Sequence, residues 1–193
     1  MTTLITKDFE NFWIRCYLGT STKVIEGSIK RAYLDFNRTV HGIRMTESQE
    51  KYLIFENYFK DLITQITSTK LANQESFDSW HRNKCQELIS LVIMHQNKKL
   101  YIGQAQKWIN MTLKYLVALG NDRVNGIILN YHLFHMPIDN IIQAKLSKIG
   151  IPKFNVAWSQ IDDYKDYIKY QKLVRSKFVG QIPMDIEFRF FNE

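Results

Sequence analysis

Apolar residues recur every three or four positions over most of the chain, which is the period of an amphipathic α-helix. The pattern predicts helices over 6–18, 24–38, 77–95, a segment from Gly103 to about Leu116, and a segment from Asp139 that stops near Gly150. Capping signals at Thr46-x-x-Gln49 and Ser159-x-x-Asp162 predict the start of a further long helix and of a last helix that reaches about Phe178. The sequence therefore indicates an all-α fold.

Two segments do not follow this period clearly. Residues 127–135 fit either a short helix or an extended segment, and Met184–Phe190 alternates apolar with polar residues, which predicts a short strand or an extended C-terminal arm. The periodic segments also identify the residues expected to face the core, namely Phe9, Phe12, Trp13, Cys16 or Tyr17, Ile25, Ile29, Ala32, Tyr33, Phe36, Phe55, Phe59, Leu62, Ile63, Ile66, Trp80, Leu88, Leu91, Val92, Ala105, Trp108, Ile109, Thr112, Leu116, Met184, Ile186, Phe188 and Phe190.

Composition and charge narrow the class of protein. The 193 residues suit a single globular unit over 1–193, and no repeat, linker or low-complexity segment interrupts it. The N-terminus does not look like a signal peptide and no apolar run is long enough to cross a membrane, so we expect a cytoplasmic protein without a membrane partner. Cys16 and Cys85 both lie in helical patterns and are expected to be buried, reduced thiols. The net charge of +7 favours an anionic partner.

Two motifs place chemically useful residues at the start of predicted helices. Gly103 forms a turn from which a helix opens, and Lys107 lies in its first turn. Asp139 follows Pro137 by two residues, at the expected N-cap of the next helix, 139 − 107 = 32 positions after the lysine. The sequence therefore predicts a lysine and an aspartate at two helix N-termini.

These motifs resemble those of the helix-hairpin-helix (HhH-GPD) DNA glycosylases. Ile102-Gly103-Gln-Ala105-Gln-Lys107 is similar to their hairpin and lysine, and His135-Met-Pro-Ile-Asp139 to their Pro-Val-Asp motif. The resemblance is nearest to the 8-oxoguanine glycosylases, particularly the archaeal type, and covers about 97–150. It implies a compact, two-lobed helical fold in which 97–150 form the central lobe and the N-terminal helices and C-terminal helix complete the fold. Ala105 and Ile102 replace the usual second glycine and proline of the hairpin, and no four-cysteine cluster follows Asp139, which excludes the iron–sulfur branch.

The resemblance implies a base-excision enzyme that needs no cofactor. Lys107 would attack the sugar C1′ and form a Schiff base, and ionised Asp139 would stabilise the positive charge that develops on the sugar. A lysine amine must be unprotonated to attack, and both the positive end of a helix dipole and burial disfavour an ammonium group. The implied activity is that of a glycosylase which also cleaves abasic sites.

Other candidate residues follow from the same resemblance. A double-stranded DNA phosphate would bind the turn formed by Gly103, Gln104 and Ala105, with Lys98, Lys99 and Lys114 beside it. A flipped base needs an aromatic slot with a few polar groups, for which the candidates are Trp158, Trp80, Phe134, His135 and Gln160. His132 and His135 have no third ligand at metal spacing, so no zinc site is expected.

The base itself is not defined by the sequence. Oxidised guanine follows from the nearest resemblance, and a hypermodified base of the kind found in phage genomes fits the same chemistry, so the role would be DNA repair or phage defence. We expect a monomer, associated with the nucleoid if the source is bacterial. Two alternatives remain, a non-catalytic helical nucleic-acid-binding protein and a helical toxin or inhibitor in which Lys107 and Asp139 are structural.

Overall fold

The computed structural model describes residues 6–40 and 48–193, and every regular element in these two ranges is helical. The α-helices are α1 (Thr6–Leu18), α2 (Val24–Phe36), α3 (Gln49–Ser68), α4 (Gln74–Gln96), α5 (Ile102–Leu119), α6 (Asn140–Lys148), α7 (Tyr164–Lys177) and α8 (Pro183–Asn192). Three short 3₁₀ helices connect them, η1 (Asn37–Thr39), η2 (Ile127–Leu133) and η3 (Trp158–Gln160). The predicted all-α class is confirmed.

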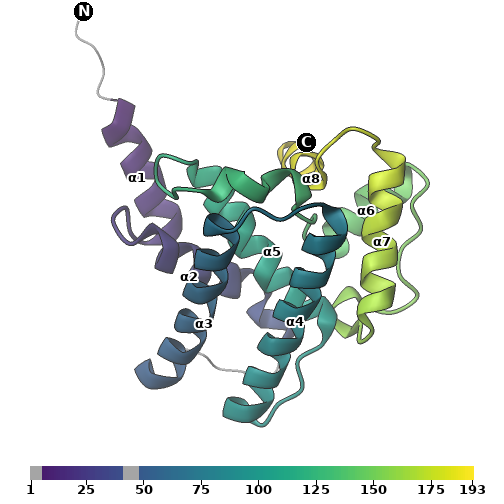
Figure 1. Cartoon of the computed structure of the whole chain (residues 1–193), viewed down its shortest axis with the longest axis horizontal. Helices are drawn as coiled ribbons and strands as arrows, with labels where there is room; N and C mark the ends of the chain where they lie inside the picture. The colour runs from purple at the N-terminus through teal and green to yellow at the C-terminus, as the bar shows by residue number, and fades with distance from the viewer. Residues whose placement is uncertain (1–5, 41–47) are drawn as a thin grey trace, which may run out of the picture.

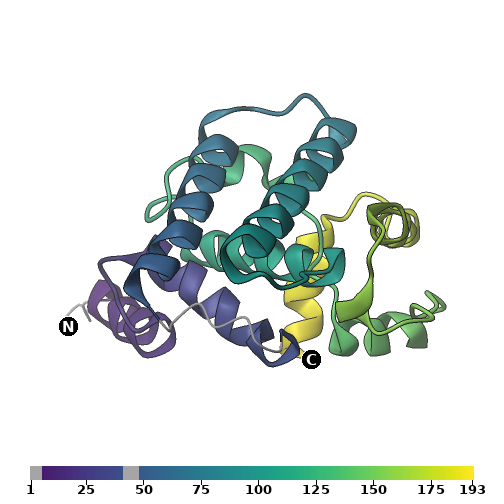
Figure 2. The ribbon, with the colours of Figure 1, turned by 90° about the horizontal axis from the view of Figure 1, so that it is seen from below.

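Helix α5 is the centre of the molecule. Every residue from Ile102 to Leu116 is buried, and α2, α4, α7, η2 and η3 all pack on this helix. Figures 1 and 2 show α3 and α4 on one side of α5, with α6 and α7 grouped at one end of the molecule. The ring of Trp108 lies among four aromatic rings of α2 and α3, those of Tyr33, Phe36, Phe55 and Phe59. A helix that is buried on all sides also buries its polar residues, so each of them needs a partner inside the protein.

The start of two helices differs from the capping signals. The N-cap of α3 is Ser48, whose hydroxyl accepts a hydrogen bond from Lys51 N, and the predicted cap Thr46 lies outside the described residues. The N-cap of α7 is Asp163 rather than Ser159. Ser159 instead lies in η3, so the predicted start of this helix was too early.

The C-terminal segment is a helix, so the predicted strand or extended arm is wrong. Pro183 occupies the first turn of α8, where its fixed φ favours a helix. Met184, Ile186 and Phe190 are buried as expected, and Phe188 packs partly against the core. The alternating pattern misled because the same apolar positions also contain the i, i+4 spacing of a helix face, in Met184 with Phe188 and in Ile186 with Phe190.

The first helix has the predicted bounds but not the predicted burial. No residue of α1 is buried, and Phe9, Phe12, Trp13 and Tyr17 are exposed by 46 to 69%. The helix packs mainly on α2, and Figure 1 shows it at the edge of the molecule. Its Cys16 is also exposed, against expectation, whereas Cys85 is fully buried. The period of the apolar residues was correct, but the described part of the chain does not cover the face that they form.

The segment between α5 and α6 is fixed to α3 and α4. Residues 127–133 form a 3₁₀ helix, one of the two alternatives that the sequence allowed. Asn130 is buried and donates hydrogen bonds to Ile66 O and Thr69 O at the end of α3. The chain then runs through buried residues 133–138 to α6. Within the described residues, no helix combines the length and apolar character needed to cross a membrane.

Candidate active site

Lys107 and Asp139, predicted to act together, are in contact. Lys107 Nζ lies 2.6 Å from Asp139 Oδ2, and the two side chains are 7% and 20% exposed. The other carboxylate oxygen of Asp139, Oδ1, accepts a hydrogen bond from Ile142 N at 2.9 Å and caps α6. One carboxylate therefore has two separable roles, since one oxygen caps the helix and the other faces the lysine.

Gln106 holds the two segments that carry this pair. Its side-chain amide donates to Ile138 O at 2.9 Å and accepts from Ile138 N at 3.3 Å, and it is fully buried. Gln106 directly precedes Lys107, and Ile138 directly precedes Asp139. The two hydrogen bonds from the Gln106 side chain to the Ile138 backbone therefore hold the segment before Asp139 next to Lys107. Asn110, one turn further along α5, donates to Gln106 Oε1 and so fixes the orientation of the amide.

A buried polar network anchors the rest of the segment before Asp139. His135 lies 2.8 Å from Asp78 on α4 and 3.0 Å from the hydroxyl of Tyr167 on α7. Burial disfavours ionisation of Asp78, but hydrogen bonds from His135 and Gln74 and the charge of Arg175 outweigh it and lower the pKa of this carboxyl to about 2. Burial lowers the pKa of His135 itself, so the neutral ring is the buried form. The network therefore fixes the approach of the chain to Asp139.

A second ion pair lies beside the first. Lys114 Nζ is 2.5 Å from Glu187 Oε2 of α8, and the two side chains are only 6% and 5% exposed. The ammonium group also lies over the ring of Phe191, 4.4 Å from its centroid. Lys114 had been expected on the surface beside a DNA phosphate, but the structure buries it, because α8 covers this side of α5.

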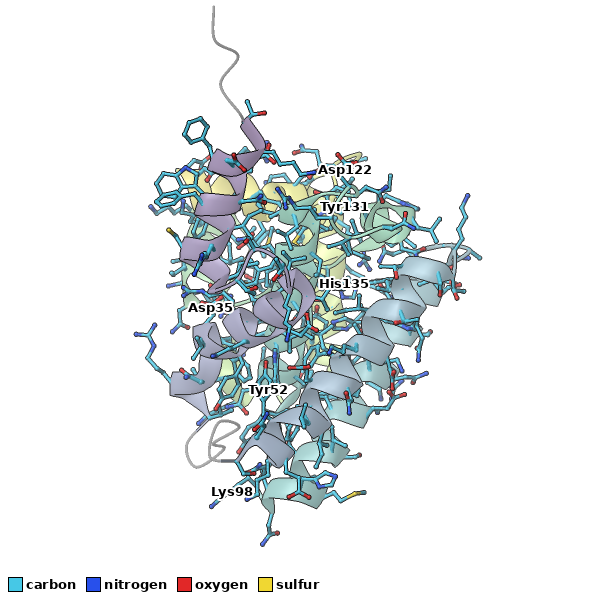
Figure 3. The ribbon with its side chains drawn as sticks, turned by 90° about the vertical axis from the view of Figure 1, so that its left-hand side faces the viewer. Asp35, Tyr52, Lys98, Asp122, Tyr131 and His135 are labelled. Atoms are coloured by element: carbon cyan, nitrogen blue, oxygen red, sulfur yellow. The ribbon has the colours of Figure 1, made fainter. Side chains whose placement is uncertain are left out.

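Both ion pairs line one cavity of about 350 Å³. Small-molecule pockets typically range from about 300 to 1,000 Å³. Its polar wall includes Arg31 and Asp35 of α2, which form an ion pair of 3.3 Å, and its apolar wall comes from Met111, Ile141, Ile142, Phe190 and Phe191. Figure 3 marks Asp35 on α2 and His135 at the start of the segment that leads to Asp139.

Two tyrosines complete this cavity. The hydroxyl of Tyr115 donates a hydrogen bond to Asp35, and the hydroxyl of Tyr17 from α1 lies 3.1 Å from that of Tyr115. Burial and the neighbouring Asp35 raise the pKa of Tyr115, which keeps its hydroxyl protonated as a donor. The guanidinium of Arg31 lies over the ring of Tyr17, 4.5 Å from its centroid. The cavity thus combines aromatic surfaces with charged groups.

The turn at Gly103 differs from the open turn that the resemblance implied. Gly103 N donates to Ile161 O, and the N–H groups of Gln104 and Ala105 both donate to Tyr101 O. A Cβ atom at Gly103 would lie 1.7 Å from Trp158 O, so the glycine is required by the close approach of η3. The Gln104 side chain donates to Thr39 O. These groups are therefore engaged within the protein rather than turned towards a phosphate.

The other two lysines expected at a phosphate lie apart from the cavity. Lys99 Nζ is 2.7 Å from Asp162 and lies over the ring of Tyr101. Lys98 is exposed beyond the end of α4, as Figure 3 shows at the lower end of the molecule. They remain candidates for contact with DNA, but not as neighbours of Lys107.

The five residues expected to form a base pocket are dispersed. Trp80, Phe134 and His135 gather round Phe77, where they contribute to the core. Trp158 is buried on η3, and Gln160, two residues later, is exposed. Among the described residues that line the cavity of Lys107 and Asp139, none belongs to this group.

Of the residues that line the cavity, Lys107, Asp139 and Lys114 were candidates from the sequence, and the others were missed. Lys107, Met111 and Lys114 stand at i, i+4 and i+7 on α5, a spacing that is typical of one shared helix face. Tyr17, Arg31, Asp35 and Glu187 come from three other helices, and no local pattern connects them to α5. Within the ranges that the structure describes, no three His, Cys, Asp or Glu side chains are grouped as a metal site.

Comparison of the chain with models of protein families, with curated proteins and with solved structures found no match. The geometry of this cavity and the sequence motifs are therefore the observations that bear on function.

Proposed function

We propose that this protein is a DNA glycosylase of the helix-hairpin-helix type that also acts as an abasic-site lyase. The observation that carries the proposal is the 2.6 Å contact between Lys107 Nζ and Asp139 Oδ2 at the wall of a cavity. The sequence motifs suggested this pair before any structural information, and a lysine nucleophile with a carboxylate beside it is what the chemistry requires. If Lys107 were only a solvated charge and Asp139 only an N-cap, nothing would require the two side chains to be in contact.

In the proposed reaction, the neutral amine of Lys107 attacks C1′ of the target nucleotide. A bond forms between Nζ and C1′, and the glycosidic C1′–N bond breaks with its electron pair leaving on the base. Asp139 stays ionised and offsets the positive charge that develops on the sugar. The nitrogen lone pair then forms a C1′=N bond as the C1′–O4′ bond breaks, and a proton from Nζ passes to O4′. The resulting Schiff base between Lys107 and the opened sugar allows loss of the C2′ proton and departure of the 3′ phosphate.

The flipped base would occupy the cavity of about 350 Å³ between α1, α2, α5, α6 and α8. Flipped bases are held by stacking on aromatic rings and by hydrogen bonds to their edges. The rings of Tyr17, Tyr115 and Phe191 supply surfaces for stacking, and the charged groups of Arg31 and Asp35 supply a donor and an acceptor. An oxidised guanine or a hypermodified base fits these requirements, with a role in DNA repair or in defence against phage.

Borohydride trapping on a duplex with a single abasic site tests the proposal without knowledge of the target base. Lys107→Gln should abolish trapping, because glutamine has no nucleophilic amine. Asp139→Asn should lower the rate by about 100-fold or more, because Oδ1 can still accept from Ile142 N while the group facing Lys107 loses its charge. Base release from a panel of modified-base duplexes would then identify the substrate.

Matched control variants separate this chemistry from structure. Lys60→Gln removes a lysine that is ion-paired to Glu26 and Glu56 on another part of the surface, and Asp163→Asn changes an aspartate that only caps α7. Both should trap like wild type. If Lys107→Gln and Asp139→Asn also trap like wild type, or if wild type traps nothing, the pair is structural and a non-catalytic nucleic-acid-binding protein or a toxin or inhibitor becomes the better assignment.

A further inference from the structure

The buried ion pair of Lys114 and Glu187 stands next to the proposed nucleophile without a role in the reaction described so far. Lys114 lies two turns after Lys107 on the same face of α5, and Glu187 reaches the same cavity from α8. The pair is buried more completely than that of Lys107 and Asp139, whose side chains are 7% and 20% exposed.

Stability alone is a weak explanation for this pair. Removing two charges from water costs several kcal/mol per ion, and an apolar pair of similar volume often stabilises a protein as well or better. The surroundings of Glu187 on α8 include Phe188, Phe190 and Phe191, so α8 already has apolar side chains to pack on α5. Proton transfer therefore explains a buried carboxylate at the edge of this cavity better than packing does.

The proposed reaction needs a proton acceptor other than Asp139. Lys107 must lose a proton before its nitrogen can attack, yet Asp139 must remain ionised to offset the charge on the sugar. If Asp139 took the proton, it would lose the charge that makes it useful. Two carboxylates whose surroundings differ can divide such roles, one as a proton carrier and one as a permanent charge.

We propose that Glu187 accepts the proton of the Lys107 ammonium and later returns it to the departing base. In the first step an Nζ–H bond breaks and an Oε–H bond forms, which frees the nitrogen lone pair for attack on C1′. In the second step the C1′–N bond breaks, the base leaves with its electron pair, and the Oε–H proton moves to that base. Glu187 ends as a carboxylate, and no external reagent is consumed. The inference rests on the proposed function.

The charges around Glu187 agree with this role. Burial raises the pKa of Glu187, and the nearby Asp139 raises it further, while Lys114 and Lys107 of α5 lower it without cancelling the effect. Arg31 and Asp35 of α2, Tyr17 of α1 and Tyr115 of α5 complete the titratable groups that line the same cavity. Asp139 differs from Glu187 in its contacts, because its second oxygen accepts a backbone N–H at the N-terminus of α6.

The test is the pH dependence of single-turnover trapping on a duplex with an abasic site. Here the amine attacks the sugar aldehyde, so the same deprotonation of Lys107 is needed. Glu187→Gln should slow trapping at neutral pH by about 100-fold, the lower end of the usual contribution of a general base. The deficit should shrink as the pH is raised towards 10, where hydroxide can remove the proton instead. Glu187→Asp should recover part of the neutral rate.

Two further variants distinguish the loss of a proton acceptor from a loss of folding. Glu56→Gln changes another buried glutamate of an ion pair, that with Lys60, and should leave both the rate and its pH profile unchanged. The double change Lys114→Met and Glu187→Met replaces the pair by apolar groups, so it should fold and still trap slowly at neutral pH. If Glu187 were only structural, its substitution would shift the melting temperature but leave the shape of the pH profile unaltered.

The possible failures can be told apart. If Lys107→Gln abolishes trapping but Glu187→Gln and the double variant keep the wild-type rate and pH profile, the role of Glu187 is overturned and the proposed function stands. If wild type fails to trap, or Lys107→Gln traps normally, the proposed function fails and this inference fails with it.

Discussion

Single residues at the proposed site each combine a structural and a chemical role. Asp139 caps α6 with one oxygen and meets Lys107 with the other. Asp139 is the predicted N-cap, but α5 begins at Ile102, so Lys107 is the sixth residue of that helix and does not lie in its first turn, where the sequence had placed it. The sequence predicted the pairing through the resemblance of the two motifs to those of DNA glycosylases. It predicted Gly103 poorly, because the feature that requires a glycine there is the backbone oxygen of Trp158, 55 positions later in the chain (158 − 103 = 55). No local pattern reports such a contact.

Gly103→Ala tests this view of the glycine. Helix propensity alone would make alanine stabilising, since glycine is unfavourable inside a helix. The added Cβ would lie 1.7 Å from Trp158 O, so η3 must move and the bond from Gly103 N to Ile161 O must weaken. We expect the free energy of unfolding, measured by denaturant titration, to fall by about 3 kcal/mol. Gly180→Ala, where open space leaves only the cost of a left-handed backbone, should lose about 1–2 kcal/mol. A more stable Gly103→Ala protein would contradict the close approach.

At the scale of helices, the sequence predicted where helices form better than it predicted what packs against them. The bounds of α1 were correct, yet its apolar residues are exposed, because periodicity describes a face and not what covers it. For α8 the short alternating segment supported two periods at once, and Pro183 at its start favoured the helix. The buried partners of α5 could not be derived, because Gln106, Asn110 and Lys114 look like ordinary polar positions of an amphipathic helix.

Gln106→Ala tests whether the join between α5 and the segment before α6 serves the reaction. Alanine keeps α5 helical but removes both hydrogen bonds to Ile138, so Asp139 is held less firmly against Lys107. We expect trapping on abasic-site DNA to slow by about 10-fold or more, since small misplacements of reacting groups have large effects on rate.

Asn130→Ala provides the comparison for Gln106→Ala. It removes another buried amide that ties two segments together, at the end of α3 and away from the cavity. Both variants should lose stability, but only Gln106→Ala should lose rate. Equal rate losses in the two variants would mean that trapping follows stability and that Gln106 has no positioning role.

At the scale of the molecule, buried polar groups connect the elements that no sequence pattern connected. His81 of α4 lies 3.1 Å from Asn110 of α5, His135 joins Asp78 of α4 to Tyr167 of α7, and Glu187 joins α8 to α5. These links hold α4, α7 and α8 against α5, the helix that carries Lys107. They also make the stability of the fold depend on pH, because their groups are buried in one protonation state.

The last prediction concerns that dependence. Burial lowers the pKa of both His81 and His135, which are fully buried and neutral. Below the usual histidine pKa of about 6.5 the unfolded chain gains protons that the folded protein does not, so stability is lost as the pH falls. Each histidine contributes up to about 1.4 kcal/mol per pH unit below that value. The raised pKa of Glu187 acts in the opposite sense, since its contribution grows as the pH falls, but it is a single group against two.

We therefore expect the free energy of unfolding to decrease between pH 7 and pH 5 in denaturant titrations, by about 2 kcal/mol from His81, whose pKa lies well below its ordinary value, with a further loss in the same direction from His135. The double change His81→Gln and His135→Gln should flatten this slope, because glutamine can donate to the acceptors Asn110 and Asp78 but does not titrate. His132→Gln, at an exposed position, should keep the wild-type slope. A wild-type stability that is constant or rises from pH 7 to pH 5 would contradict this prediction. It would show that His81 and His135 take up protons as readily in the folded protein as in the unfolded chain.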